Sequence, residues 1–199
     1  VLSSKVDNYL GYQLVTGAEL VQKFEEHVKE FDIKLEVGLK VKNIKKINSG
    51  FEVSTESESY QGRTVIIASG KVPRRLNIPG EREFLGRGVT YCATCDAPLF
   101  PKKDVAVVGG GNYALDATIQ LTRIANKIYL INIKPALGGD EIMREKVIAA
   151  PNVEILNNTE VKRILGEKFV NEIKILDKSS AQLKKLKVQG IFIEIGSIP

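Results

Sequence analysis

Cys92 and Cys95 are the side chains of this sequence that are best suited to redox chemistry. They are the only cysteines in a chain of 199 residues, and two residues separate them. A C-x-x-C pair with no other thiol favours a disulfide that is reduced and re-formed, with the thiolate as the attacking species. Asp96 adjoins the second sulfur, where a carboxyl either passes a proton to a departing thiolate or caps the turn before Pro98.

Zinc binding is the structural alternative for the two cysteines. A closed structural zinc site needs four ligands. Because His27 is the only histidine, the chain supplies three soft ligands at most. We therefore expect a redox pair and no bound metal.

A glycine-rich segment with the sequence GGGNYA follows the cysteines and fits the G-x-G-x-x-G/A pattern of dinucleotide-binding turns. Its first glycine permits a tight turn, its third lets the backbone approach a pyrophosphate, and its final alanine allows close packing of helix and strand. The candidate cofactor-binding residues of this segment are Gly109, Gly110, Gly111, Asn112, Tyr113 and Ala114.

The flanking segments supply the elements that such a turn requires. Residues 105–108 are apolar and β-branched, as in a strand buried on both faces of a parallel sheet. Apolar residues recur at helical spacing from Tyr113 onward, and residues 127–133 read as a second strand. Three consecutive glycines alone also suit a flexible connector, so this predicted βαβ unit is what favours the dinucleotide turn.

The end of the second strand bears on the choice of nucleotide. An acidic residue about twenty positions past the glycines favours NAD, and an arginine nearby favours NADP. This chain has Asn132, which can bond a ribose hydroxyl, and Lys134, which can attract a phosphate. Both are candidate cofactor contacts, and the cofactor is predicted as NADPH or NADH. Arg144 would change this prediction if the following helix turned it toward the ribose.

The motifs together resemble those of the low-molecular-weight thioredoxin reductases, a group that includes the flavoprotein component of alkyl hydroperoxide reductase. The resemblance is carried by CATCD at Cys92–Asp96 with GGGN after it, by VDNYLG at Val6–Gly11, by ASG at Ala68–Gly70 and by IFIEIG at Ile191–Gly196. The family commonly has His-Arg-Arg where this chain has Asn132-Ile133-Lys134, which leaves the cofactor open.

The resemblance implies a pyridine nucleotide-disulfide oxidoreductase that passes electrons from NAD(P)H through FAD to the cysteine pair, and on to a thioredoxin-like or other disulfide-containing redox protein. It implies that Cys95 lies nearest the flavin, that Cys92 attacks the substrate disulfide and that Asp96 handles the proton. It also implies a homodimer. The flavin contacts that it indicates are Asn8, Ser69 and Gly70.

The predicted fold is α/β, with a Rossmann-like nucleotide-binding domain joined to an incomplete FAD-binding domain. By the resemblance, residues 1–87 are part of the FAD-binding domain and residues 88–199 are the NAD(P)H-binding domain with the cysteines. The latter combines a parallel sheet with a three-stranded antiparallel meander. The family's FAD glycine motif is absent, so we expect the chain to be the middle of a longer polypeptide. Gly86 and Gly88 are predicted hinge positions between the domains.

Other segments have simpler patterns. Thr16 to Glu30 predicts a helix with a capping box, residues 33–53 predict short strands with a turn at 48–50, and residues 64–69 predict a fully apolar strand.

Composition excludes other classes of function. The formal charge of +5 and the pI of about 9.1 permit nucleic-acid binding, but the lysine clusters lack aromatic neighbours and alternate with apolar residues. No apolar run reaches the length of a membrane span and no secretory signal is seen, so we expect a cytoplasmic protein without nucleic-acid or membrane partners. The alternative function is a nucleotide-binding module that lacks bound FAD and turnover.

Overall fold

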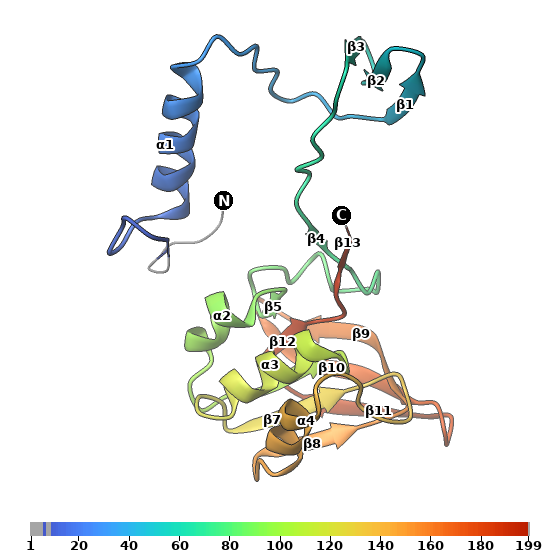
Figure 1. The fold of residues 1–199 in the computed structure, drawn as a ribbon. Coiled ribbons are helices and arrows are strands. Elements are labelled where there is room, and N and C mark those ends of the chain that lie inside the picture. Colours follow the sequence, from blue (N-terminus) through green and yellow to red (C-terminus); the bar gives the residue numbers. More distant parts are fainter. Residues whose placement is uncertain (1–5, 7–8, 199) are drawn as a thin grey trace. The chain divides into compact units, whose positions relative to one another are not determined.

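The computed structural model describes Val6 and residues 9–198 (Figure 1). The chain divides into two compact units, Val1–Ser69 and Gly70–Pro199. This division at 69/70 lies earlier in the chain than the predicted domain boundary at 87/88. Residues 70–87 belong to the second unit because Phe84 is part of its core and the carbonyl of Pro79 accepts a hydrogen bond from the amide of Ile164. The assignment of residues 1–87 to FAD binding stays a prediction.

The first unit contains the predicted helix and a small antiparallel sheet. Helix α1 (Gly17–Lys29) begins after Thr16, whose hydroxyl accepts from the amide of Glu19 while the Glu19 carboxylate accepts from the amide of Thr16, so the capping box is confirmed. Strands β1 (Asn43–Ile47), β2 (Gly50–Ser54) and β3 (Ser59–Gly62) pair in sequence order. The turn predicted at 48–50 joins the first two strands.

Two predicted strands of the first unit are wrong. Residues 33–37 form no strand, and residues 64–69 form none either, with Ile66 92% and Ile67 72% exposed. An apolar strand is stable only between neighbours that pair with its backbone and cover its faces. None of the strands within the described residues pairs with 64–69.

The second unit is built on a five-stranded parallel sheet with the order β5, β12, β6, β7, β8. Its strands are β5 (Val89–Thr90), β6 (Asp104–Val108), β7 (Lys127–Ile131), β8 (Val153–Leu156) and β12 (Gly190–Ile193). Helix α3 (Asn112–Leu121) connects β6 to β7, which confirms the predicted βαβ unit. Helix α4 (Glu141–Ile148) connects β7 to β8.

An antiparallel meander lies on the other face of the parallel sheet from α3 and α4 (Figure 1). It consists of β9 (Thr159–Gly166), β10 (Val170–Asp177) and β11 (Gln182–Lys187), with β10 in the middle, and confirms the predicted three-stranded meander. A two-stranded pair, β4 (Val72–Pro73) with β13 (Ser197–Ile198), completes the strands of this unit within the described residues.

The sheet is buried on both faces, and alternate residues of β6 belong to different cores. Val105 and Val107 pack with the helices, together with Leu115 of α3. Ala106 and Val108 pack with the meander. Successive side chains of a strand point to opposite faces, so a continuous apolar run is what a central strand in this position requires.

Candidate active site

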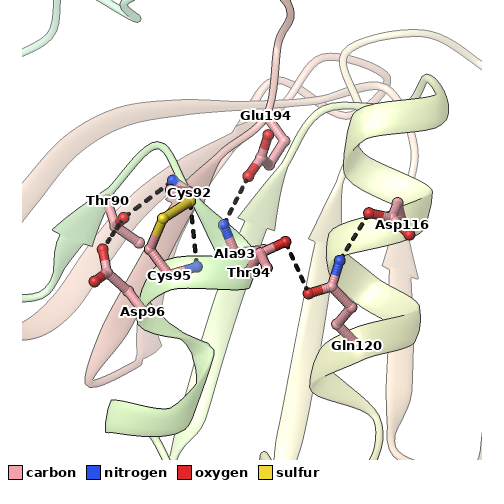
Figure 2. Close-up of a disulfide and its surroundings, with 9 residues drawn as sticks. All are labelled: Thr90, Cys92, Ala93, Thr94, Cys95, Asp96, Asp116, Gln120 and Glu194. Carbon is pink, nitrogen blue, oxygen red and sulfur yellow. Dashed lines mark hydrogen bonds between the residues drawn. A yellow bond between two sulfur atoms is a disulfide. The ribbon is translucent and has the colours of Figure 1, made fainter. Parts of the chain in front are cut away.

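Cys92 and Cys95 form a disulfide at the start of the short helix α2 (Ala93–Asp96) (Figure 2). Cys92 is the N-cap of this helix, and its sulfur accepts a hydrogen bond from the amide of Cys95 at 3.2 Å. Cys92 is partly buried and Cys95 is exposed. The same amide would stabilise a thiolate on Cys92 once the disulfide is reduced, because a hydrogen bond to the charged form favours that form.

Asp96 is held beside the disulfide by Thr90, the last residue of β5. The Thr90 hydroxyl donates to the Asp96 carboxylate and accepts from the amide of Cys92 at 3.1 Å (Figure 2). Thr90 is buried, so its position is fixed by the end of the sheet. The arrangement brings the three predicted redox residues into one cluster.

Side-chain hydrogen bonds link helix α2 to helix α3. The Thr94 hydroxyl donates to the Gln120 amide oxygen at 3.2 Å, and the Gln120 amide nitrogen donates to Asp116 at 2.7 Å (Figure 2). The disulfide therefore has a defined position relative to the helix that begins at the glycine turn.

Next to Cys92 in the sequence, Tyr91 is anchored by a buried carboxylate. Glu81 is 1% exposed and accepts from the amides of Leu76 at 2.9 Å and Asn77 at 2.6 Å and from the hydroxyl of Tyr91 at 2.7 Å. Burial and the hydrogen bond to Glu81 raise the pKa of Tyr91 to about 12, so the phenol remains a donor at neutral pH.

Glu194, which sequence reasoning missed, lies on the other side of the disulfide. It follows β12, and its carboxyl accepts from the amide of Ala93 at 3.3 Å (Figure 2). Burial raises the pKa of Glu194 to about 7, the bond from Ala93 acts in the opposite direction, and the nearby Asp116 raises the pKa further. The available sequence signal was a single carboxylate within the otherwise apolar IFIEIG run.

The glycine turn has the shape that the motif predicts. Gly109 has φ +145°, and a Cβ atom there would lie 2.3 Å from the carbonyl oxygen of Glu194 and 2.9 Å from the Cβ of Ala114. Ala114 is fully buried, so the small residue does allow close packing at this turn. Gly111 is the N-cap of α3, and a Cβ atom there would have no neighbour within 4 Å.

Asn132 has a role inside the protein that the sequence did not predict. It is 2% exposed, and its amide nitrogen donates to the carbonyls of Lys134 and Ala136 and to the side chain of Asn157. Its amide oxygen accepts from the amide of Lys134 and lies so close to Gly110 that a Cβ atom there would be 2.3 Å away. A ribose contact by Asn132 stays a prediction, and it would compete with these bonds.

The loop after β7 is joined to the glycine turn. Gly138 donates from its amide to the carbonyl of Gly110 at 2.7 Å, and the amide of Asp140 donates to the side chain of Asn112 at 2.7 Å. The Asn112 side chain therefore holds this loop beside the glycine turn.

A cavity of about 600 Å³ opens at the carboxyl ends of β6 and β7. The predicted residues that line it are Gly109, Gly110, Gly111, Tyr113, Asn132 and Lys134. Arg74, Thr159, Glu160 and Glu194 also line it and were not predicted. Arg144 lines a different cavity of about 370 Å³, next to Leu137 and Ile155.

The structure does not test the predicted flavin contacts. Asn8 lies outside the described residues. Ser69 and Gly70 are exposed. Their contact with FAD stays a prediction.

Comparison with known proteins relates this geometry to one family. Residues 4–199 match the family described as pyridine nucleotide-disulphide oxidoreductase. The chain is 37% identical over 195 residues to an NADH dehydrogenase of Bacillus subtilis, covering 98% of this chain and 38% of that protein. It is 34% identical over 195 residues to an alkyl hydroperoxide reductase component of Staphylococcus epidermidis, with the same coverage of 98% and 38%.

Solved thioredoxin reductases have a similar structure. The enzyme from Streptococcus pyogenes shares 33% identity with a TM-score of 0.74, and the match covers 99% of this chain and 64% of that one. The enzyme from Giardia duodenalis shares 26% identity with a TM-score of 0.78 and the same coverage of 99% and 64%. The chain therefore spans less than two thirds of the length of each of these relatives.

Proposed function

Because this chain belongs to the pyridine nucleotide-disulphide oxidoreductase family, we propose that it carries electrons from NAD(P)H, with FAD, to the Cys92–Cys95 disulfide and on to a protein disulfide. The observation that carries the proposal is that the disulfide and the glycine-turn cavity share one residue. The Glu194 carboxyl accepts a hydrogen bond from the amide of Ala93, the first residue of α2, and Glu194 also lines the cavity.

The residues of the glycine turn fit a dinucleotide. Gly111 leaves open space in front of its backbone at the N-terminus of α3, where amide groups that lack helical partners suit a pyrophosphate. Tyr113, which is 55% exposed, and Lys134 line the cavity. We assign the nucleotide to this cavity, with Lys134 near the ribose.

A bound FAD would supply the two-electron relay between the nucleotide and the disulfide. Asn8, Ser69 and Gly70 are the proposed flavin contacts, and residues 1–87 the proposed part of its domain. The relatives support this part of the proposal, because an alkyl hydroperoxide reductase component and several thioredoxin reductases are among them.

The residues of the cysteine cluster have distinct roles in this proposal. Reduction breaks the bond between the two sulfurs and adds two electrons and two protons. The amide of Cys95 stabilises a thiolate on Cys92, and Asp96 exchanges the proton of the departing sulfur. Cys92 is the sulfur proposed to attack the partner's disulfide, and Cys95 is the one proposed to face the flavin.

The partner is proposed to be a thioredoxin-like or other disulfide-containing protein, and the complete protein a homodimer. A dithiol that is regenerated at every turnover suits a reducing compartment, which favours the cytoplasm. Separately, the structure shows no helix, among the residues it describes, that has the length and apolar character of a bilayer span.

A nucleotide-binding module without FAD is the second candidate, because the glycine turn and the cavity beside it lie within one compact unit, Gly70–Pro199. The test is oxidation of NADH or NADPH in the presence of FAD and a chromogenic aromatic disulfide. We expect turnover by the wild type and loss of disulfide reduction in Cys92→Ser and Cys95→Ser. Nucleotide binding with neither flavin absorption nor turnover would instead establish the module.

A further inference from the structure

We propose that the Glu194 carboxyl takes up a proton when the Cys92–Cys95 disulfide is reduced, and that this uptake contributes to the pH dependence of the reduction. The inference deepens the proposed function, because it concerns the same redox pair. Asp96 is the proton-handling residue that the sequence indicates, and Glu194 is a second, on the opposite side of Cys92 (Figure 2).

The position of Glu194 is fixed by backbone contacts at the centre of the second unit. Its amide donates to the carbonyl of Val108 at 2.8 Å, and its carbonyl packs against Gly109. The side chain reaches the amide of Ala93, which belongs to the peptide bond that follows Cys92. The carboxyl is thus held next to the sulfur-bearing residue by elements that are far apart in the sequence.

The charged group that acts on the pKa of Glu194 is the Asp116 carboxylate. Among Val6 and residues 9–198, no lysine or arginine forms an ion pair with Glu194. The titratable groups on the packed elements and around the shared cavity are Asp96 of α2, Asp116 and Tyr113 of α3, Arg74, Lys134 and Glu160. Of these, Asp116 raises the pKa of Glu194, in the same direction as burial.

Reduction adds a further negative charge to this cluster. The Cys95 amide would stabilise a thiolate on Cys92, the residue between two carboxylates: the amide that follows Cys92 donates to Glu194, and its own amide donates to Thr90, which holds Asp96. Like charges at close range disfavour each other's ionised form. Since the pKa of Glu194 is already about 7, this carboxyl takes up a proton from solvent at little cost when the thiolate forms.

The sign of the effect follows from the protonation states. Below about pH 6 Glu194 is neutral in both redox states, and its substitution by glutamine changes no charge. Above about pH 8 it is ionised in the disulfide form and repels the thiolate of the reduced form, so the wild type is harder to reduce than the variant. The difference between the two proteins therefore grows as the pH rises through about 7.

The test is the thiol–disulfide equilibrium of the chain with dithiothreitol at pH values from about 6 to about 9, read by alkylation of free thiols. At each pH, the equilibrium constant for reduction of Glu194→Gln is divided by that of the wild type. Ionisation of the dithiothreitol thiols affects both constants equally and therefore does not change this ratio. We expect a ratio near one at about pH 6 that rises to roughly three- to tenfold at about pH 8.5, as one like-charge interaction in a partly solvated site gives. A ratio that stays constant with pH would overturn the inference.

Two further variants separate a titrating carboxyl from a structural one. Glu167→Gln removes the same charge from an exposed turn and should leave the ratio at one throughout. Asp116→Asn removes the charge that raises the pKa of Glu194, so the wild-type transition should move to lower pH. If Glu194→Gln fails to fold, the ratio of the equilibrium constants of Asp116→Asn and wild type decides: a ratio that changes with pH near 7 supports the inference, and a ratio that is constant with pH overturns it.

The equilibrium with dithiothreitol needs neither FAD nor nucleotide, so it fails independently of the proposed function. A pH-dependent ratio without any NAD(P)H-driven turnover would contradict only the proposed function. A flat ratio with normal turnover would contradict only the role of Glu194.

Discussion

Replacing Gly111 by valine should abolish nucleotide binding without unfolding the protein. The backbone of Gly111 is extended, with φ −106° and ψ −170°, and no atom lies within 4 Å of a Cβ placed there. Valine adopts this conformation readily, and Gly111 makes no side-chain cap bond that could be lost. The expected loss of stability is about 1 kcal/mol or less, a change in Tm of about 2–4 °C for a chain of this size.

The effect on binding should be much larger. The valine side chain would occupy the space where the pyrophosphate meets the amides of the turn. Loss of two charge-assisted hydrogen bonds of about 1.5 kcal/mol each raises the Kd by more than about 100-fold. Alanine at the same position should give a smaller loss, because its side chain fills less of the space.

Gly109→Val is the matched contrast. At φ +145° and with the Glu194 carbonyl 2.3 Å from the added Cβ, valine there should cost several kcal/mol of stability. The assays are titration calorimetry with NADH and NADPH, and thermal unfolding followed by circular dichroism, on the wild type and both variants. A folded Gly111→Val protein with unchanged affinity, or a Gly109→Val protein as stable as the wild type, would refute the placement of the nucleotide or the packing of the turn.

The remaining predictions concern cofactor choice, the buried carboxylate and pH. NADH and NADPH should bind with Kd values within about tenfold at equal ionic strength, because Lys134 offers one exposed charge, Arg144 lines another cavity and Arg74 donates to the carbonyl of Ser197; a preference for NADPH above about 100-fold would contradict this. Glu81→Ala should cost about 3 kcal/mol or more, since it leaves three donors without an acceptor, whereas Tyr91→Phe should cost about 1 kcal/mol; equal losses in denaturant titrations would exclude this role. Because the pKa of Glu194 is raised on folding, the wild type should lose stability as the pH rises through about 5 to 7, and Glu194→Gln should not; parallel Tm profiles would count against the raised pKa.

Sequence patterns were sufficient where the determinants are local. The βαβ unit around the glycine turn is specified by an apolar strand, three glycines and a helical repeat within one short segment, and the structure contains it at β6, α3 and β7. The meander of β9 to β11 was predicted for the same reason, because alternation and turn residues occur within each hairpin.

Patterns were insufficient where distant segments meet. The strand predicted at 64–69 has the right composition but no pairing neighbour among the described strands. Glu194 approaches Ala93 across a sequence separation of 101 residues, and no spacing rule connects the two. Asn132 was predicted from its position after a strand, but its neighbours Gly110 and Asn157 determine which bonds its amide makes.

The measurement that tests the proposed electron path most directly is a count of thiols after a single addition of nucleotide. The oxidised protein would be mixed with FAD and with NADH or NADPH under anaerobic conditions, then alkylated and weighed by mass spectrometry. Electron transfer to the Cys92–Cys95 disulfide predicts two new alkylated thiols per chain, and none in a sample without nucleotide. A disulfide that stays oxidised with nucleotide bound, yet is opened by dithiothreitol, would contradict the path.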